Sequence, residues 1–228
     1  MSAMAPRQAG PPQIGATQTP DFTPDQLESI EVNGLDAQFG LEDVRVCSAS
    51  LPETDAGSGR FRRTHLKDID FGESKLRAVQ FIDVVAERID AANGDWGGAQ
   101  FRRAQFKEAR LTGLNLAEAQ IEQMSFKGCK LDYANFRHSA IKQVSFEDCV
   151  LTGADFQGAN LNATLFSRCQ LAEADFSKAE MSLVDLRGSE LALAGSVLGL
   201  RGAIIDPLQL MELARTLAQE LGIAVEDI

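Results

Sequence analysis

The sequence predicts an all-β solenoid, a four-sided β-helix of about eight coils that ends in a C-terminal α-helix. The first observation is a large apolar residue at every fifth position from Phe101 to Leu191, where all 19 residues are Phe, Leu, Ile or Met. The second is a column two residues earlier, which is rich in alanine and contains no charge. The third is the return of identical residues every 20 positions.

A period of five excludes the ordinary secondary structures. On an α-helix a five-residue step turns by ~140°, so the large residues would spread over every face. On a flat strand an odd step would move the large residue to the opposite side. We therefore expect each unit to contain a short extended piece with two inward side chains, followed by two residues that turn a corner. Glycine is favoured at such corners.

The 20-residue return indicates that four units make one coil. Like residues should then stack on like, with successive coils paired as parallel strands ~4.8 Å apart. The predicted core ladders are Phe106, Phe126, Phe146 and Phe166; Phe136, Phe156 and Phe176; and Cys129, Cys149 and Cys169. In these inward positions cysteine acts as a small apolar residue.

The repeat register divides the chain into four segments. Residues 1–24 contain five of the seven prolines and are predicted to be a disordered tail. Residues 25–38 are a lead-in and cap, and residues 39–196 form the coils, a rod of roughly 38 Å. Residues 197–228 form a second cap that carries a helix.

Two places in the coils are expected to be irregular. Residues 52–59 (PETDAGSG) read as a surface loop. In residues 82–98 alanine takes two of the large positions, which suggests a distorted coil with a bulging corner. These two segments are the candidates for projecting loops.

The C-terminal helix has clear boundary signals. Asp206 suits the N-cap, Pro207 the first helical position and Gly222 the stop. The helix carries more apolar side chains than are needed to cover the end of the rod, which favours a homodimer interface over a simple cap. The candidate interface residues are Leu208, Met211, Leu217 and Leu221.

Composition limits the function. The net charge of −11 argues against direct nucleic-acid binding and favours a protein partner with a basic face. No apolar run is long enough for a membrane helix and the N-terminus lacks a secretory pattern, so we expect a cytoplasmic protein that does not bind membranes. His65 and His138 lie in outward columns without metal-ligand spacing. We expect no enzyme activity, cofactor or metal.

Within residues 61–228 the acidic charge lies toward the C-terminus. Residues 141–228 hold 13 acids and six bases, whereas residues 61–140 hold 11 acids and 13 bases. Residues 61–191 have a net charge of only −2, against roughly 22 charges on 38 Å of duplex DNA. The candidate partner-binding residues of the last coils are Asp148, Asp155, Glu173, Asp175, Glu180, Asp185 and Glu190.

Some of these acids also belong to a polar ladder. Asn115, Asn135, Asp155 and Asp175 recur every 20 residues, just before a large position. For the two asparagines we favour hydrogen bonding between coils. For the two aspartates that role is compatible with a line of surface charge.

The units Ala154-Asp155-Phe156-Gln157-Gly158 and Ala174-Asp175-Phe176-Ser177-Lys178 resemble the pentapeptide-repeat family. The resemblance implies a right-handed quadrilateral β-helix. The ending Gly222-Ile223-Ala224-Val225 after an apolar helix also resembles the Qnr-type and MfpA-type quinolone-resistance branch. That branch implies a C-terminal dimer that mimics DNA, binds DNA gyrase or topoisomerase IV and modulates fluoroquinolone sensitivity. The alternative function is a structural interaction scaffold for an unidentified protein partner.

Overall fold

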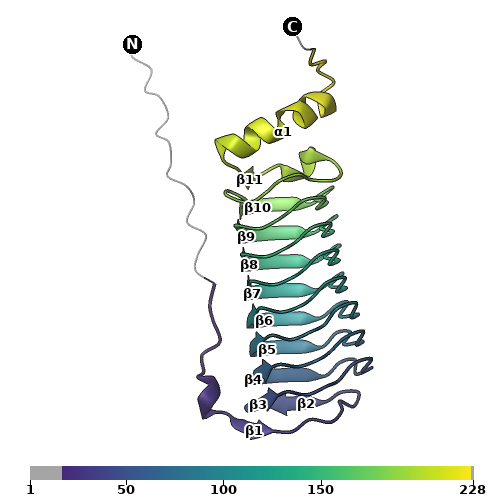
Figure 1. Cartoon of the computed structure of the whole chain (residues 1–228), viewed down its shortest axis with the longest axis vertical. Coiled ribbons are helices and arrows are strands. Elements are labelled where there is room, and N and C mark those ends of the chain that lie inside the picture. Colours follow the sequence, from purple (N-terminus) through teal and green to yellow (C-terminus); the bar gives the residue numbers. More distant parts are fainter. Residues whose placement is uncertain (1–16, 227–228) are drawn as a thin grey trace.

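The computed structural model describes residues 17–226, which form a parallel β-solenoid of about nine turns with one C-terminal α-helix (Figure 1). Two 3₁₀ helices, η1 (Pro24–Gln26) and η2 (Val197–Leu200), lie near the ends, and α1 (Pro207–Glu220) closes the rod. The strands are β1 (Glu28–Ile30), β2 (Gly40–Glu42), β3 (Val44–Cys47), β4 (Arg60–Lys67), β5 (Gln80–Glu87), β6 (Gln100–Lys107), β7 (Gln120–Lys127), β8 (Ala140–Glu147), β9 (Asn160–Ser167), β10 (Glu180–Asp185) and β11 (Ala203–Ile204). The predicted fold class is confirmed.

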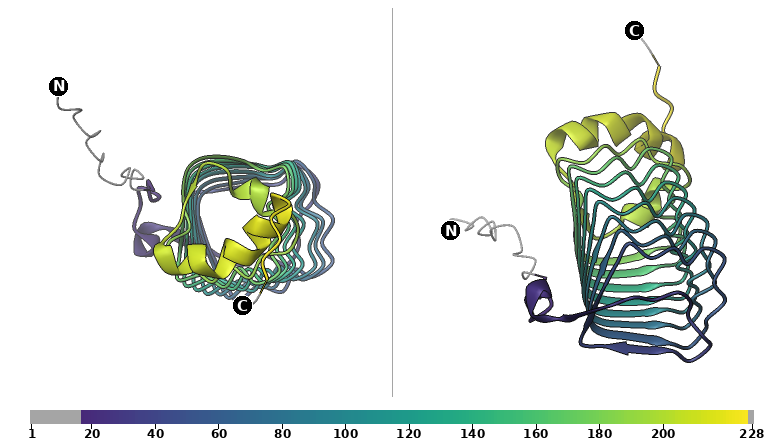
Figure 2. Two further views of the ribbon diagram at one scale, coloured as in Figure 1. Left: turned by 90° about the horizontal axis from the view of Figure 1, so that it is seen from above. Right: turned by 60° about the horizontal axis from the view of Figure 1, so that its bottom comes forward.

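Successive coils pair in register at a separation of 20 residues. From β3 to β10 each strand is hydrogen-bonded to the next as a parallel neighbour, so that Phe126 lies opposite Phe146. The remaining two sides are joined by single bridges such as Asn135 with Asp155 and Val150 with Gln170. Seen along its axis the rod has a square outline (Figure 2).

The rod is about one turn longer than the eight coils expected. At the start, β1 pairs with β3 inside the predicted lead-in 25–38. At the end, β11 pairs with β10 beyond residue 196, where the repeat pattern stops. Both additions are short strands whose residues lack the five-residue pattern, which is why the sequence did not predict them.

Each corner of the coils is made by a residue in the left-handed backbone region, two positions after the large apolar residue. Arg103, Tyr133 and Gly153 are examples, with φ of 51°, 55° and 65°. Glycine occupies six of these corner positions, and the rest are residues for which the left-handed region costs roughly 1–2 kcal/mol. Corner glycine was therefore predicted correctly, but the corner itself does not require it.

The core consists of the predicted ladders. Phe126, Phe146 and Phe166 stack with ring centroids 4.9 and 4.8 Å apart and planes within 7° of parallel. The second ladder, Phe136 to Phe176, stacks in the same way at 4.7 and 4.8 Å. Phe106 differs, because its ring meets Phe126 edge-on at 68°. These ladder residues are buried, so apolar contact along the axis holds the coils together.

The two places expected to be irregular are regular coils. Residues 52–59 follow the same pattern of bridges and turns as the other coils, and residues 82–98 contain most of β5 and the regular corners after it. The predictions of a loop and of a bulging corner were therefore wrong. Neither segment projects from the rod.

An exchange of volume explains the regular coil at 82–98. Ala86 and Ala91 leave space in the large positions, and Ile89 fills part of it from a position that is usually small. Trp96 is fully buried, stacks on Phe81 at 5.2 Å and donates a hydrogen bond from Nε1 to Ser74 Oγ at 3.0 Å. Large residues at 89 and 96 thus accompany small ones at 86 and 91, and packed cores tolerate exchanges that offset volume better than a net change.

Gly94 completes this exchange and gives a test of it. A Cβ at Gly94 would lie 3.1 Å from Trp96 Nε1 and 3.2 Å from Leu114 Cδ1. We expect Gly94→Ala to lower the free energy of unfolding by about 1–3 kcal/mol in urea titrations. Gly40→Ala is the control, since a Cβ there meets nothing within 4 Å. Equal stability of the two variants would contradict the packing argument.

The two terminal segments lie differently on the rod, since the N-terminal one runs along its side and α1 lies across its C-terminal end (Figure 1). Near the N-terminus, residues 17–24 of the predicted disordered tail run alongside the coils, while residues 1–16 lie outside the described part (Figure 1). At the C-terminus, the Asp206 side chain accepts hydrogen bonds from the N–H groups of Leu208 and Gln209, which confirms the predicted N-cap. Gly222 has φ of 71° at the predicted stop. No helix within residues 17–226 is long and apolar enough to cross a membrane.

Candidate protein-binding surface

The predicted acidic residues do not gather on one side of the rod. Asp155 and Asp175 stack in one column, and Glu190 stacks on Gln170 in another. Glu180 and Asp185 lie at the two ends of β10. Since five residues span one side, these acids are spread over all four sides of the last coils.

Three of the seven acids are neutralised by arginine. Asp148 receives two hydrogen bonds from Arg168, at 2.6 and 2.8 Å. Asp155 pairs with Arg137 at 2.6 Å. The hydrogen bond from Arg168 holds the pKa of Asp148 below its usual value. These acids add little net charge for a partner to detect.

The five acids other than Asp148 and Asp155 comprise one buried acid that is paired, Asp185, and four that have no basic partner in residues 17–226. Asp185, which is nearly buried, pairs with Arg187 at 2.5 Å, and this contact lowers its pKa. Within the described residues Glu173, Asp175, Glu180 and Glu190 have no basic group within 4 Å. These four residues are the unpaired part of the predicted acidic surface.

The polar ladder has the structural role that the sequence indicated. Asn135 donates from Nδ2 to Asn115 Oδ1 at 3.0 Å, and Asn115 donates in turn to Asp95. Each member also accepts a hydrogen bond from the backbone N–H two residues later, as in Asp155 with Gln157 and Asp175 with Ser177. These side chains therefore connect coils and hold turns.

The sequence analysis missed Tyr133, the chain's single tyrosine. Its side chain is 63% exposed, and on the described coils only Leu183 is another exposed large apolar residue. The ring lies over the corner of the next coil, where a Cβ on Gly153 would come within 2.6 Å of it. The left-handed backbone of Tyr133 and the absence of a side chain at Gly153 thus allow the exposed ring to lie in this position. The lone aromatic in a corner column could have indicated it.

Two polar residues follow Tyr133 along the same coil, Arg137 on the next side and His138 at the next corner. Arg137 is half exposed and paired with Asp155. The His138 ring covers Gly158 as Tyr133 covers Gly153. Tyrosine and arginine are enriched among the residues that dominate binding energy in protein interfaces. We call Tyr133, Arg137 and His138 the tyrosine patch.

The candidate dimer residues divide between two faces of α1. Leu208, Met211 and Leu221 are exposed, as is Leu210. Leu217 instead packs against the core at the end of the rod, next to the buried Leu213. An apolar cavity of about 500 Å³ lies between α1 and η2, lined by Val197, Leu198, Leu200, Arg201, Ile205, Leu213 and Leu217.

The three stacked cysteines have a structural role. The thiols of Cys129, Cys149 and Cys169 donate to backbone carbonyls of the phenylalanine ladder at 3.3–3.5 Å. Contact with the thiol below raises the pKa of Cys149 to about 12. All three are buried, and Cys47 is exposed. Within residues 17–226 no group of three or more His, Cys, Asp or Glu residues is placed to hold a metal ion.

His65 is buried, although the sequence placed it in an outward column. It is 5% exposed, and neither ring nitrogen has a hydrogen-bond partner. Arg45 and Val85 lie on either side of it in the neighbouring coils, Glu87 Oε2 is 3.4 Å from Nε2, and Lys67 is nearby. Burial lowers the pKa of His65 below its usual value despite Glu87.

This burial makes stability depend on pH. Because the folded chain binds the His65 proton less readily than the unfolded chain, stability is complete above pH ~6.5 and falls as pH drops through the lowered pKa. We expect His65→Val, which copies Val85 in the next coil, to reduce the difference in unfolding free energy between about pH 7.5 and pH 5. Urea titrations at both values check this, and an unchanged difference would contradict it.

Comparison with known proteins agrees with the geometry. Residues 99–176 match the family model for the pentapeptide repeat region. No curated protein matches the sequence. A trypsin-treated variant of QnrB1, a plasmid-mediated fluoroquinolone resistance protein, has a similar structure, with 18% identity and a TM-score of 0.58 over 88% of this chain and 100% of that chain. HetL, a pentapeptide repeat protein involved in heterocyst differentiation regulation in the cyanobacterium Nostoc, is 22% identical, with a TM-score of 0.47 over 74% and 90%.

Residues 99–176 of the chain are a pentapeptide repeat region. The similarity to QnrB1 extends over the whole of that structure but concerns the fold, because the sequence identity is low.

Proposed function

We propose that this protein is a non-enzymatic binding protein that engages another protein through the sides of its rod. The observation that carries the proposal is the tyrosine patch, in which an exposed aromatic ring is held over Gly153. A rigid aromatic side chain loses little entropy on binding, so it suits an interface anchor. The many carboxylates paired with arginine do not offer a free acid and base for catalysis.

A type II topoisomerase, DNA gyrase or topoisomerase IV, is our candidate partner. The fold is shared with a fluoroquinolone resistance protein, and the chain is acidic, as a protein that occupies a DNA-binding surface should be. Glu173, Asp175, Glu180 and Glu190 would supply unpaired charge to such a contact. In this proposal the protein modulates fluoroquinolone sensitivity and acts in the cytoplasm, without binding nucleic acid or membranes directly.

The spread of acidic residues favours a second function, a scaffold for an unidentified protein partner. DNA carries one charge per ~1.7 Å, whereas the acids here lie on four sides and several are paired. A scaffold needs the exposed tyrosine patch but no continuous line of negative charge.

A supercoiling assay distinguishes the two functions. With a gyrase partner, micromolar protein should inhibit supercoiling or protect it from a fluoroquinolone. Tyr133→Ala should weaken this effect about tenfold or more, as expected for loss of an interface anchor. Leu183→Ala, which removes the other exposed apolar side chain of the coils, serves as the matched control. If the wild-type protein has no effect on gyrase or topoisomerase IV, the scaffold function is favoured. The partner of the scaffold should then bind the wild-type protein and should not bind the Tyr133→Ala variant.

We further propose a homodimer formed through the exposed apolar side chains of α1 and its C-cap, which are Leu208, Leu210, Met211 and Leu221. A dimer would remove these side chains from water and stabilise the complex by about 25 cal/mol for each Å² of apolar surface buried. Two acidic ends would then lie close together.

Light scattering after size-exclusion chromatography tests the dimer. We expect the wild type to elute with twice the chain mass and Met211→Glu to shift it toward the monomer, because the new carboxylate would be buried unpaired. Gln219→Glu adds the same charge at an exposed polar position of α1 and should leave the dimer intact. A monomeric wild type, or equal effects of both variants, would overturn the proposal.

A further inference from the structure

A group of arginines forms a positive region on this acidic chain. Three of them, Arg60, Arg62 and Arg63, lie on β4. The other two, Arg102 and Arg103, lie on β6, and β5 separates the two strands. We call these five residues the arginine corner. Glu42, Asp43 and Asp83 accompany them, and Glu122 lies beside Arg102 in the next coil, so the corner has a net charge of about +1, whereas the chain has −11.

The pairing within the corner is incomplete. Arg62 contacts Glu42, Arg63 contacts Asp43 at 2.5 Å, and Arg103 makes two hydrogen bonds of 2.6 Å to Asp83. Arg60 and Arg102 have no carboxylate within 4 Å among the described residues. The corner therefore retains unpaired cations next to well-ordered ion pairs.

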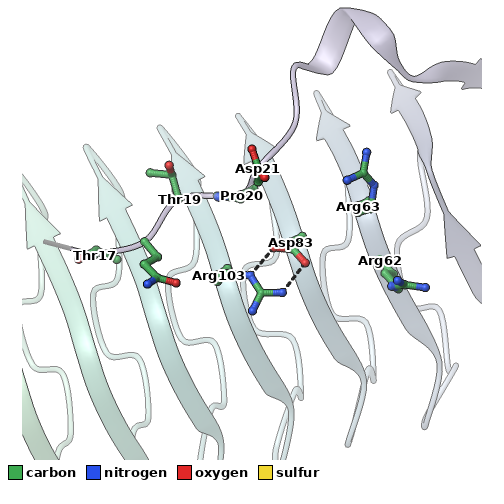
Figure 3. A pocket seen from close by; sticks show the side chains of 9 residues that line it. Thr17, Thr19, Pro20, Asp21, Arg62, Arg63, Asp83 and Arg103 are labelled. Atoms are coloured by element: carbon green, nitrogen blue, oxygen red, sulfur yellow. Dashed lines mark hydrogen bonds and ion pairs between the residues drawn. The ribbon is translucent and has the colours of Figure 1, made fainter.

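The chain's own N-terminal segment lies across this corner. Residues 17–22, which we call the strap, cross the strands above Arg63, Asp83 and Arg103 (Figure 3). The segment belongs to a stretch, residues 17–44, that contains seven acids and no lysine or arginine. Within the strap itself the single acid is Asp21, which helps to raise the pKa of Arg63 after the larger effects of Asp43 and Asp83.

The strap is held loosely. The Phe22 ring makes a cation–π contact, with its centroid 6.0 Å from the Arg63 guanidinium carbon. Within the described residues no hydrogen bond joins residues 17–22 to the coils, and a polar cavity of about 800 Å³ remains between strap and rod. A cation–π contact at an exposed site contributes only about 0.5–1 kcal/mol. A competing segment could therefore replace the strap.

We propose that the arginine corner is a docking site for an extended acidic peptide of a partner protein, and that the strap occupies this site in the free protein. The strap defines the chemistry of the ligand, a carboxylate followed directly by an aromatic ring, as in Asp21-Phe22. A nucleic acid fits less well, because Asp43 and Asp83 alternate with the arginines and would repel a continuous row of phosphates. The site is independent of the tyrosine patch and of any topoisomerase.

Competition with the strap gives a direct test on the full-length protein. The probe is a fluorescent peptide with the sequence of residues 17–26, TQTPDFTPDQ, followed by fluorescence anisotropy. A tethered segment acts at an effective concentration on the order of 1 mM, so a peptide with a Kd of about 0.1 mM should bind about tenfold more tightly once the strap is released. The double variant Asp21→Lys with Phe22→Ala releases the strap by removing its charge and its ring.

Variants of the corner provide the control. In the released protein, Arg63→Glu with Arg103→Glu should abolish peptide binding. Arg88→Glu with Arg168→Glu should not, although these arginines make the same paired contacts to Asp68 and Asp148 at another corner. Circular dichroism confirms that each variant is folded.

Three results would overturn the proposal. The first is that the peptide binds the wild-type and released proteins with equal affinity. The second is that both pairs of arginine variants lose the same amount of peptide binding. The third is that the corner binds a short single-stranded DNA and does not bind the peptide. Since the assay contains no topoisomerase, its outcome is separate from that of the supercoiling experiment.

Discussion

The fold depends on the exact return of the chain to the same position after 20 residues. Each coil can bond to the next only if all four corners turn by the same amount, and a left-handed residue at every fifth position provides this. Once the return is fixed, Phe146 must lie over Phe126 and Cys149 over Cys129, so the core is built from like residues in contact. The apolar ladders then stabilise the corners, whose backbone conformation is unfavourable for most residues.

Most of this fold could be predicted from the sequence because the repeat encodes it directly. The side-chain columns, the four sides, and the N-cap at Asp206 all follow from residue spacing. The coil at 82–98 could not be predicted, because Ala86 and Trp96 each break the column rule and compensate only in three dimensions. The first and last strands were missed for a similar reason, since they pair through backbone groups that any residue carries.

The candidate binding surface was less predictable than the fold. Sequence counts gave the acidic character of the last coils, but not the pairing of Asp148 with Arg168 or of Asp155 with Arg137. In a solenoid, residues 20 apart are neighbours, so a carboxylate and an arginine in one column cancel locally. Exposed pairs of this kind contribute little stability, roughly 0–1 kcal/mol each. Their larger effect is to leave Tyr133 and a few unpaired charges as the features that a partner can recognise.

The cap at the C-terminal end has a consequence beyond the single chain. Gln209 points its side-chain amide into the last coil and donates to the carbonyl oxygens of Leu186 and Ser189, both at 2.7 Å. In the middle of the rod such groups bond to the following coil, so this one amide substitutes for a coil that does not exist. Without it, the final turn would offer open acceptors to any extended chain, and rods could add end to end into filaments. The glutamine therefore helps α1 to close the last coil against further strand pairing.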